Sequence, residues 1–189
     1  MRTDSFDIQT MKKVFLFIAA VIGLGIATGF DAGAQEKDLD ATYATQLLKP
    51  GTKAPDFQVT APDGKTLKLS KFKGKTVVLD FWASWCGDCR RELPAVEAAY
   101  ERFSKKGVVF IGVSFDDNKE KWTAAIDQFG LKYLQGSELK KWSDTEVSPL
   151  YNLKWIPTLY IIDKKGKVVL GTVMTEKMIS RLEAMTEGK

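Results

Sequence analysis

The sequence VVLDFWASWCGDCRRE, residues 77–92, joins the pattern of a buried β-strand directly to a pair of cysteines. The apolar run begins after Gly74 and helix-forming residues follow the cysteines, so the pattern predicts a central strand, a tight turn and a helix. Cys86 then stands at a helix N-terminus, where free backbone N–H groups and the helix dipole stabilise a thiolate. Cys89 follows one turn later, close enough to attack a mixed disulfide at Cys86. A C-x-x-C pair beside a β-α pattern indicates redox chemistry.

Two structural roles compete with the redox role of this pair. A structural zinc site needs four ligands, and the chain has two Cys and no His, so carboxylates would have to complete it. A purely structural disulfide is the second alternative. It would restrain the unfolded chain very little, because it closes a very short loop.

Size and composition indicate one globular domain with a short additional segment. The chain has 189 residues, of which 44% are hydrophobic and 11% aromatic, enough for a packed core. Its net charge of +4 is modest and its charges are interspersed, so we expect no nucleic-acid binding. The absence of His removes the usual general base and argues against Ser-His-Asp and Cys-His hydrolases.

The first residues are typical of an export signal. Lys12 and Lys13 precede an apolar run from 14 to about 30, and Ala32-Gly33-Ala34 forms a small-residue cleavage site. We expect residues 1–34 to be a signal peptide, and we suspect that translation starts at Met11. An uncleaved membrane anchor is the alternative, because about 17 apolar residues is near the lower limit for a spanning helix. Either way we expect a periplasmic or otherwise exported domain. It is preceded by a linker at 35–50, which is either a tether or a short helix that ends at Pro50-Gly51.

Strands and helices alternate after this linker. Residues 57–60 and 66–69 flank a Pro-Asp-Gly turn, which predicts a hairpin. Apolar residues at helical spacing over 93–103 and a second buried strand at 108–115 complete a strand–helix–strand unit with parallel pairing. Further elements are expected as a helix between 118 and 130, short helical pieces at 138–142 and 146–151, an edge hairpin over 159–170, and a final helix from about 175.

The segment from Asp80 to Cys89 resembles the active-site signature of thioredoxins, and Ile156-Pro157-Thr158 resembles their cis-proline segment. The export signal, the leading hairpin, the residues inserted before the proline and Glu92 are similar to the TlpA/ResA-like thiol-disulfide oxidoreductases. The resemblance covers roughly Lys49 to Lys189. It implies an α/β, thioredoxin-like fold over residues 51–189, with a central mixed β-sheet flanked by helices and an N-terminal β-hairpin.

The resemblance also implies roles for four catalytic residues. Cys86 is the exposed attacking thiolate and Cys89 the buried resolving thiol. Asp80, a carboxylate in an apolar strand, is expected beneath the pair, where burial raises its pKa and lets it accept the Cys89 proton. Its alternative is a strand-end carboxylate that binds a backbone N–H. Glu92 either serves the same purpose or is an exposed first-turn acid; many similar chains carry Asn in place of Asp80, so the acceptor stays open.

A substrate-binding rim follows from the same resemblance. Pro157, if cis, turns the backbone of its neighbour toward an incoming peptide, which would bind by strand-like hydrogen bonds. The residues expected at this rim are Trp85, Gly87, Asp88, Trp155, Ile156, Pro157 and Thr158.

Asp88, between the cysteines, departs from the resembling families. Thioredoxins usually carry Pro there, and strong oxidants carry His. A carboxylate beside Cys86 disfavours the thiolate, and a less stabilised thiolate corresponds to a less oxidising couple. We therefore predict that the protein mainly reduces the disulfides of other proteins.

The sequence thus predicts an exported protein-disulfide reductase with no metal and no cofactor beyond a redox-active Cys86–Cys89 disulfide. Its expected partners are protein thiols and disulfides, with apocytochrome c one candidate, and a membrane protein as electron donor. A peroxiredoxin-like thiol peroxidase is the main alternative, but its reactive cysteine would lie in a Pro/Thr-rich turn. A copper chaperone would need a longer cysteine spacing and a His ligand, and the chain has neither.

Overall fold

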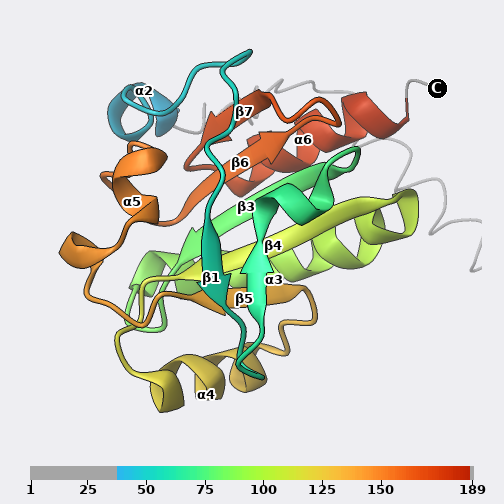
Figure 1. Cartoon of the computed structure of the whole chain (residues 1–189). Helices are drawn as coiled ribbons and strands as arrows, with labels where there is room; N and C mark the ends of the chain where they lie inside the picture. Colours follow the sequence, from blue (N-terminus) through green and yellow to red (C-terminus); the bar gives the residue numbers. More distant parts are fainter. Residues whose placement is uncertain (1–37, 188–189) are drawn as a thin grey trace, which may run out of the picture. The chain divides into compact units, whose positions relative to one another are not determined.

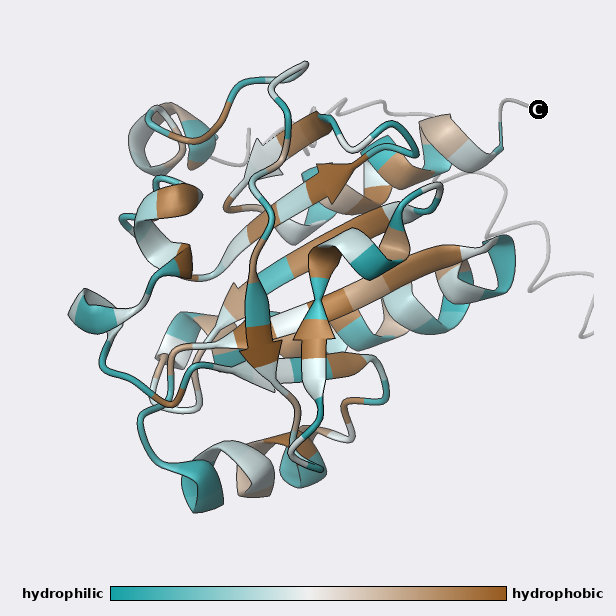
Figure 2. Cartoon of the chain, in the orientation of Figure 1, coloured by the Kyte–Doolittle hydropathy of each residue, from teal (hydrophilic) through white to brown (hydrophobic). Residues whose placement is uncertain are grey.

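Strands β3 (Thr76–Trp82) and β4 (Val108–Ser114) form the centre of the fold in the computed structural model, which describes residues 38–187. Every β3 residue after Thr76 is buried, as expected for a strand covered on both faces. The two strands pair in parallel along their whole length. This confirms the predicted strand–helix–strand unit, whose apolar strands stand out in brown in Figure 2.

The sheet of the described residues has seven strands in the order β2-β1-β5-β4-β3-β6-β7 (Figure 1). At one edge, β1 (Gln58–Thr60) and β2 (Thr66–Lys68) pair antiparallel around the Pro-Asp-Gly turn. At the other edge, β6 (Thr158–Ile162) pairs antiparallel with both β3 and β7 (Val168–Thr172). Parallel and antiparallel pairs therefore occur in one mixed sheet, as predicted.

Helices α3 (Gly87–Phe103) and α6 (Thr175–Thr186) lie together behind the sheet in Figure 1. Arg102 of α3 joins them through ion pairs to Glu183 and Glu187, at 2.5 and 2.6 Å. The side of α3 that faces the sheet is the predicted apolar one. Its buried residues are Cys89, Leu93, Val96, Ala99 and Phe103.

Helix α4 (Lys119–Phe129) begins and ends where the sequence predicts. The Asn118 side chain accepts a hydrogen bond from the backbone N–H of Lys121 at 2.8 Å, which caps the helix N-terminus. Gly130 ends the helix in a left-handed conformation, with φ of 61°.

Strand β5 (Leu134–Ser137) is an element that the sequence analysis missed. Its residues show no apolar alternation, so the local pattern favours a loop. Its backbone pairs in parallel with β4, and Gly136 allows a close approach to β1, because a Cβ atom there would overlap the Val59 side chain. Beyond it, the helical piece expected at 146–151 is confirmed as the short helix α5 (Val147–Leu150). The piece expected at 138–142 is wrong: Leu139 has a positive φ of 51°, which a helix does not allow, and only a 3₁₀ turn at Trp142–Asp144 follows.

Residues 38–50, assigned to a linker from the sequence, pack against the domain. Asp40, at the start of helix α2 (Asp40–Tyr43), accepts hydrogen bonds from the Thr172 hydroxyl at 2.8 Å. Leu47 is buried in the core, and the Leu48 N–H donates to the Tyr160 hydroxyl at 3.0 Å. The compact unit accordingly begins at Asp38 and not at the predicted boundary, Gly51.

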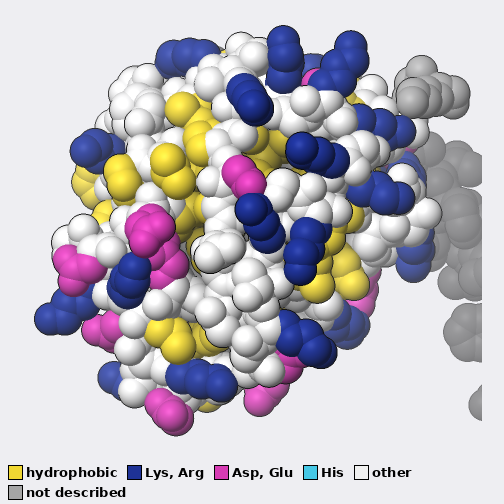
Figure 3. All heavy atoms as spheres, viewed as in Figure 1, with side chains coloured by type: hydrophobic (Ala, Val, Ile, Leu, Met, Phe, Trp, Pro, Cys, Tyr) yellow, Lys and Arg dark blue, Asp and Glu magenta, His cyan; other side chains and the backbone are white. Residues whose placement is uncertain are grey.

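Charged side chains cover much of the face seen in Figure 3, with apolar side chains visible between them. A hollow of about 570 Å³ lies where β3 begins and β6 ends, lined by Lys53, Lys73, Lys75, Lys164 and Lys165 among others. The predicted signal peptide lies outside the described residues. Between residues 38 and 187, the structure contains no helix with the length and apolar composition needed to cross a membrane.

Candidate active site

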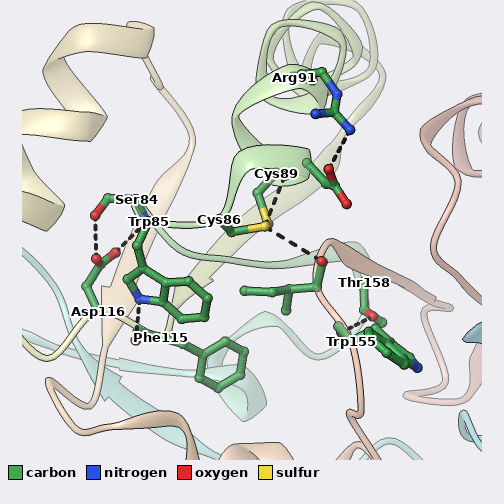
Figure 4. The surroundings of a disulfide bond; sticks show 11 residues. Ser84, Trp85, Cys86, Cys89, Arg91, Phe115, Asp116, Trp155 and Thr158 are labelled. Atoms are coloured by element: carbon green, nitrogen blue, oxygen red, sulfur yellow. Dashed lines mark hydrogen bonds and ion pairs between the residues drawn. A yellow bond between two sulfur atoms is a disulfide. The ribbon is translucent and has the colours of Figure 1, made fainter.

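Cys86 and Cys89 lie at the start of helix α3, which follows strand β3 after a short turn. Cys86 is the N-cap of the helix, and its sulfur accepts the backbone N–H of Cys89 at 3.1 Å. The two residues form a disulfide, with 5.3 Å between their Cα atoms (Figure 4). Cys86 is 8% exposed and Cys89 1%, so the predicted order of accessibility holds, although the Cys86 of the disulfide form is itself buried.

The segment containing Pro157 lies directly against the disulfide. The Ile156–Pro157 peptide bond is cis, as the resemblance to the thioredoxin cis-proline segment implies. The Ile156 carbonyl oxygen is 3.6 Å from the Cys86 sulfur (Figure 4). The Thr158 hydroxyl donates to the Trp155 carbonyl at 2.7 Å, which closes the turn on its other side. An extended peptide that approached Cys86 would therefore meet this backbone.

Trp85 and Trp155 lie on either side of the Cys86 sulfur in Figure 4 and are 58% and 53% exposed. They line a hollow of about 420 Å³ that includes Cys86, Gly87 and Asp88. Exposed tryptophans around a hollow form an apolar surface suited to another protein.

A second hollow, of about 350 Å³, continues this surface past the cis-proline segment. It is lined by Pro157 together with Asp88 and Glu92, and by Leu39 and Tyr43 from the N-terminal segment. The Tyr43 ring meets the Trp155 ring edge to face, with centroids 4.9 Å apart. The N-terminal segment therefore supports one side of the predicted rim.

Asp116, which the sequence analysis did not single out, anchors the turn before Cys86. This buried carboxylate accepts the backbone N–H of Ser84 at 2.9 Å and the Ser84 hydroxyl at 2.5 Å (Figure 4). It also accepts the Ser114 hydroxyl at 2.6 Å. Three donors hold this carboxylate, so the cysteine turn is tied to the end of strand β4.

Asp80 is buried in strand β3, two residues before its end. The Tyr133 hydroxyl donates a hydrogen bond to it at 2.7 Å. Burial raises the pKa of Asp80 to about 7, and the bond from Tyr133 limits the rise. The Tyr133 ring contacts Tyr100 of α3, which places Asp80 on the sheet face that also receives Cys89.

The acids on α3 have different surroundings from Asp80. Asp88 is exposed and pairs with Arg91, one turn further along the helix (Figure 4). Glu92 is half-buried and lines the hollow beside Pro157. Of the two carboxylates predicted as proton acceptors, only Asp80 is fully enclosed. No cluster of three or more Cys, Asp or Glu side chains in the described part of the chain could hold a metal ion.

Comparison with known proteins identifies the family. The model described as AhpC/TSA family matches residues 50–170. The thiol-disulfide oxidoreductase ResA of Bacillus subtilis (strain 168) is 34% identical over 172 residues, which cover 89% of this chain and 90% of the relative. The chain belongs to the AhpC/TSA family. Like its ResA relatives, this AhpC/TSA protein is a thiol-disulfide oxidoreductase.

Solved structures agree with this assignment of the AhpC/TSA chain. The thioredoxin domain of a thiol-disulfide oxidoreductase from Bacteroides vulgatus is 30% identical and superposes with a TM-score of 0.68, covering 74% of this chain and 99% of that one. A candidate thiol:disulfide interchange protein DsbE from Chlorobium tepidum is 31% identical, with a TM-score of 0.66, covering 72% and 97%. The thioredoxin-like fold predicted from the sequence is confirmed.

Proposed function

We propose that the chain is an exported reductase of protein disulfides, in which Cys86 attacks and Cys89 resolves. The observation that carries the proposal is the position of Cys86 at the N-terminus of α3, beside the Ile156 carbonyl and with Cys89 behind it. The N–H groups at the helix end stabilise the thiolate of the reduced form. The cis-proline segment offers backbone to an extended partner.

The exchange proceeds in two steps. The Cys86 thiolate attacks one sulfur of a partner disulfide, which forms a mixed disulfide and releases one partner thiolate. Cys89 then loses its proton and attacks the Cys86 sulfur, which releases the second partner thiolate and forms the Cys86–Cys89 disulfide. Two electrons pass to the partner. We assign Asp80 as the acceptor of the Cys89 proton, because its pKa of about 7 suits proton exchange near neutrality.

Insulin reduction tests the activity directly. The mature protein, recycled by a small dithiol, is expected to reduce insulin disulfides, and Cys86→Ser to abolish this turnover. Peroxide consumption is measured in parallel, because a peroxidase is the competing function. Peroxide turnover without insulin reduction would overturn the proposal.

The direction of exchange is a separate part of the proposal. Asp88 beside the Cys86 thiolate disfavours the anion and so lowers the oxidising power of the couple. Equilibration with glutathione measures the potential. A reductant should have a reduction potential near that of thioredoxin. A reduction potential near that of DsbA would contradict the assignment.

Trapping of mixed disulfides identifies the clients, and cell fractionation tests the location. Cys89→Ser is expected to freeze the mixed disulfide at Cys86, and Cys86→Ser is the matched control that captures nothing. We propose protein disulfides as the client class, with apocytochrome c as one candidate and a membrane protein as electron donor. Fractionation of cells that express the full chain tests export and shows whether the N-terminus is cleaved or anchored.

A further inference from the structure

A cluster of polar side chains is buried in the sheet beside the proposed proton acceptor. Asp80 on β3, Gly112 on β4 and Gln135 on β5 stand side by side in register. A Cβ atom at position 112 would overlap the Gln135 side chain, so the glycine provides the space that this amide occupies. Gln135 is held there by the Trp82 indole N–H, which donates to its Oε1 at 3.1 Å.

Tyr133 completes this cluster, and its hydroxyl is the hydrogen-bond donor to Asp80, at 2.7 Å. Tyr133 is 3% exposed and Asp80 is 2% exposed, so water does not compete freely for the bond. Burial raises the pKa of Tyr133 well above its usual value of 10.0, which keeps the hydroxyl protonated near neutrality. The tyrosine is thus a permanent donor to the carboxylate.

We propose that Tyr133 is a positioning residue for the exchange reaction: its hydroxyl fixes the orientation of the Asp80 carboxylate and stabilises the ionised form that accepts the Cys89 proton. The inference rests on the proposed role of Asp80. Without the donor, a larger share of the buried carboxylate would hold its own proton at neutral pH, and that share could not accept another. With it, part of the Asp80 population is ionised and ready.

No other group described around Asp80 is shown to orient its carboxylate or to stabilise its ionised form. The positions beside it in the sheet, Gly112 and Leu159, carry no charge. From α3, Cys89 is the proposed proton donor, the Tyr100 ring contacts the Tyr133 ring, and the charge of Glu97 raises the pKa of Tyr133. Gln135 is neutral, and its side chain acts on the Tyr133 hydroxyl, whose pKa it lowers.

The test separates the two steps of the exchange. Reduced protein is mixed with an equal amount of an aromatic disulfide that releases a coloured thiolate at each step. The first colour phase reports attack by Cys86 and the second reports resolution by Cys89. In Tyr133→Phe we expect the pH midpoint of the second phase to rise by about one unit, which slows this phase about tenfold below the midpoint. The first phase keeps its pH profile.

Tyr151→Phe is the matched control. It also removes one buried hydroxyl, which donates to the Pro55 carbonyl at 2.7 Å and does not touch Asp80. We expect no shift of either midpoint. In an Asp80→Asn background, Tyr133→Phe should add no further shift.

Two results would overturn the inference: an unchanged midpoint in Tyr133→Phe, or the same shift in the Asp80→Asn background. If Tyr133→Phe does not fold, 3-fluorotyrosine at position 133 decides. This stronger donor should lower the midpoint, and no change would count against the role. Failure of the proposed function itself would look different, because the wild-type protein would then not reduce insulin.

Discussion

Asp80 lies in an interior that favours its neutral form, and this gives folding stability a pH dependence. Its pKa is about 7 in the folded protein, against 3.8 for an ordinary aspartate. Between these values the folded state holds a proton that the unfolded state has released. Stability contributed by the neutral carboxyl is therefore complete at low pH and lost as the pH rises through about 7.

For the oxidised protein, we expect the unfolding free energy to fall by up to about 4 kcal/mol between pH 4 and pH 7, and Asp80→Asn to remove this fall. The chain has no His and its two Cys are joined in this form, but burial also raises the pKa of Glu97, so the difference between the wild type and Asp80→Asn makes the assignment. Urea denaturation at several pH values measures it. Asp127→Asn, at an exposed position of α4, should leave the pH dependence intact.

The Asp88 carboxylate is exposed, so solvent weakens its electrostatic effect on the Cys86 thiolate. The carboxylate pairs with Arg91, and both side chains are exposed. Replacing it by Ala removes a negative charge near Cys86, so we expect alkylation of the reduced protein at pH 7 to become about two- to threefold faster. High salt should shrink this difference. Equal rates for both proteins at low salt would show that the departure from the usual proline has no electrostatic effect.

Among the elements, the turn between β3 and α3 depends on a residue from the next strand. Asp116 receives Ser84 and Ser114 hydrogen bonds in a buried position. Asp116→Ala would leave these donors without their acceptor, and we expect a loss of about 2–3 kcal/mol in unfolding free energy. Thermal and urea denaturation measure it, with Asp117→Ala, at an exposed neighbouring position, as control. A loss below about 0.5 kcal/mol would contradict the anchoring role.

Elements with a strong local signal could be predicted, and those created by tertiary contacts could not. The patterns of β3, β4, α3 and α6 are regular over whole elements, and the cysteine and cis-proline motifs are contiguous in sequence. Strand β5 is short and polar, so nothing local indicates it. The role of Tyr133 depends on Asp80, 53 residues away, and the role of Asp116 depends on Ser84, 32 residues away. Their roles required the order of the strands, which no motif in the sequence reports.

For the molecule as a whole, the segment before the predicted domain boundary contributes to stability. Leu47 is 3% exposed in the common core, although the sequence around it is polar and weakly periodic. Leu47→Ala should cost about 2–4 kcal/mol of unfolding free energy. Leu39→Ala, in the same segment but 39% exposed, should cost far less. Equal, small effects at both positions would indicate that the segment does not dock in solution.

Trp85 and Trp155 lie on either side of the Cys86 sulfur (Figure 4), so tryptophan fluorescence should report whether the disulfide is oxidised or reduced. A disulfide accepts an electron from a nearby excited indole, whereas thiols do so poorly, and Trp85 is the residue next to Cys86. Tryptophan emission should therefore brighten when the bond is reduced, and Trp85→Phe should lose most of this change. Electron transfer to and from this molecule could then be followed in real time without any added dye.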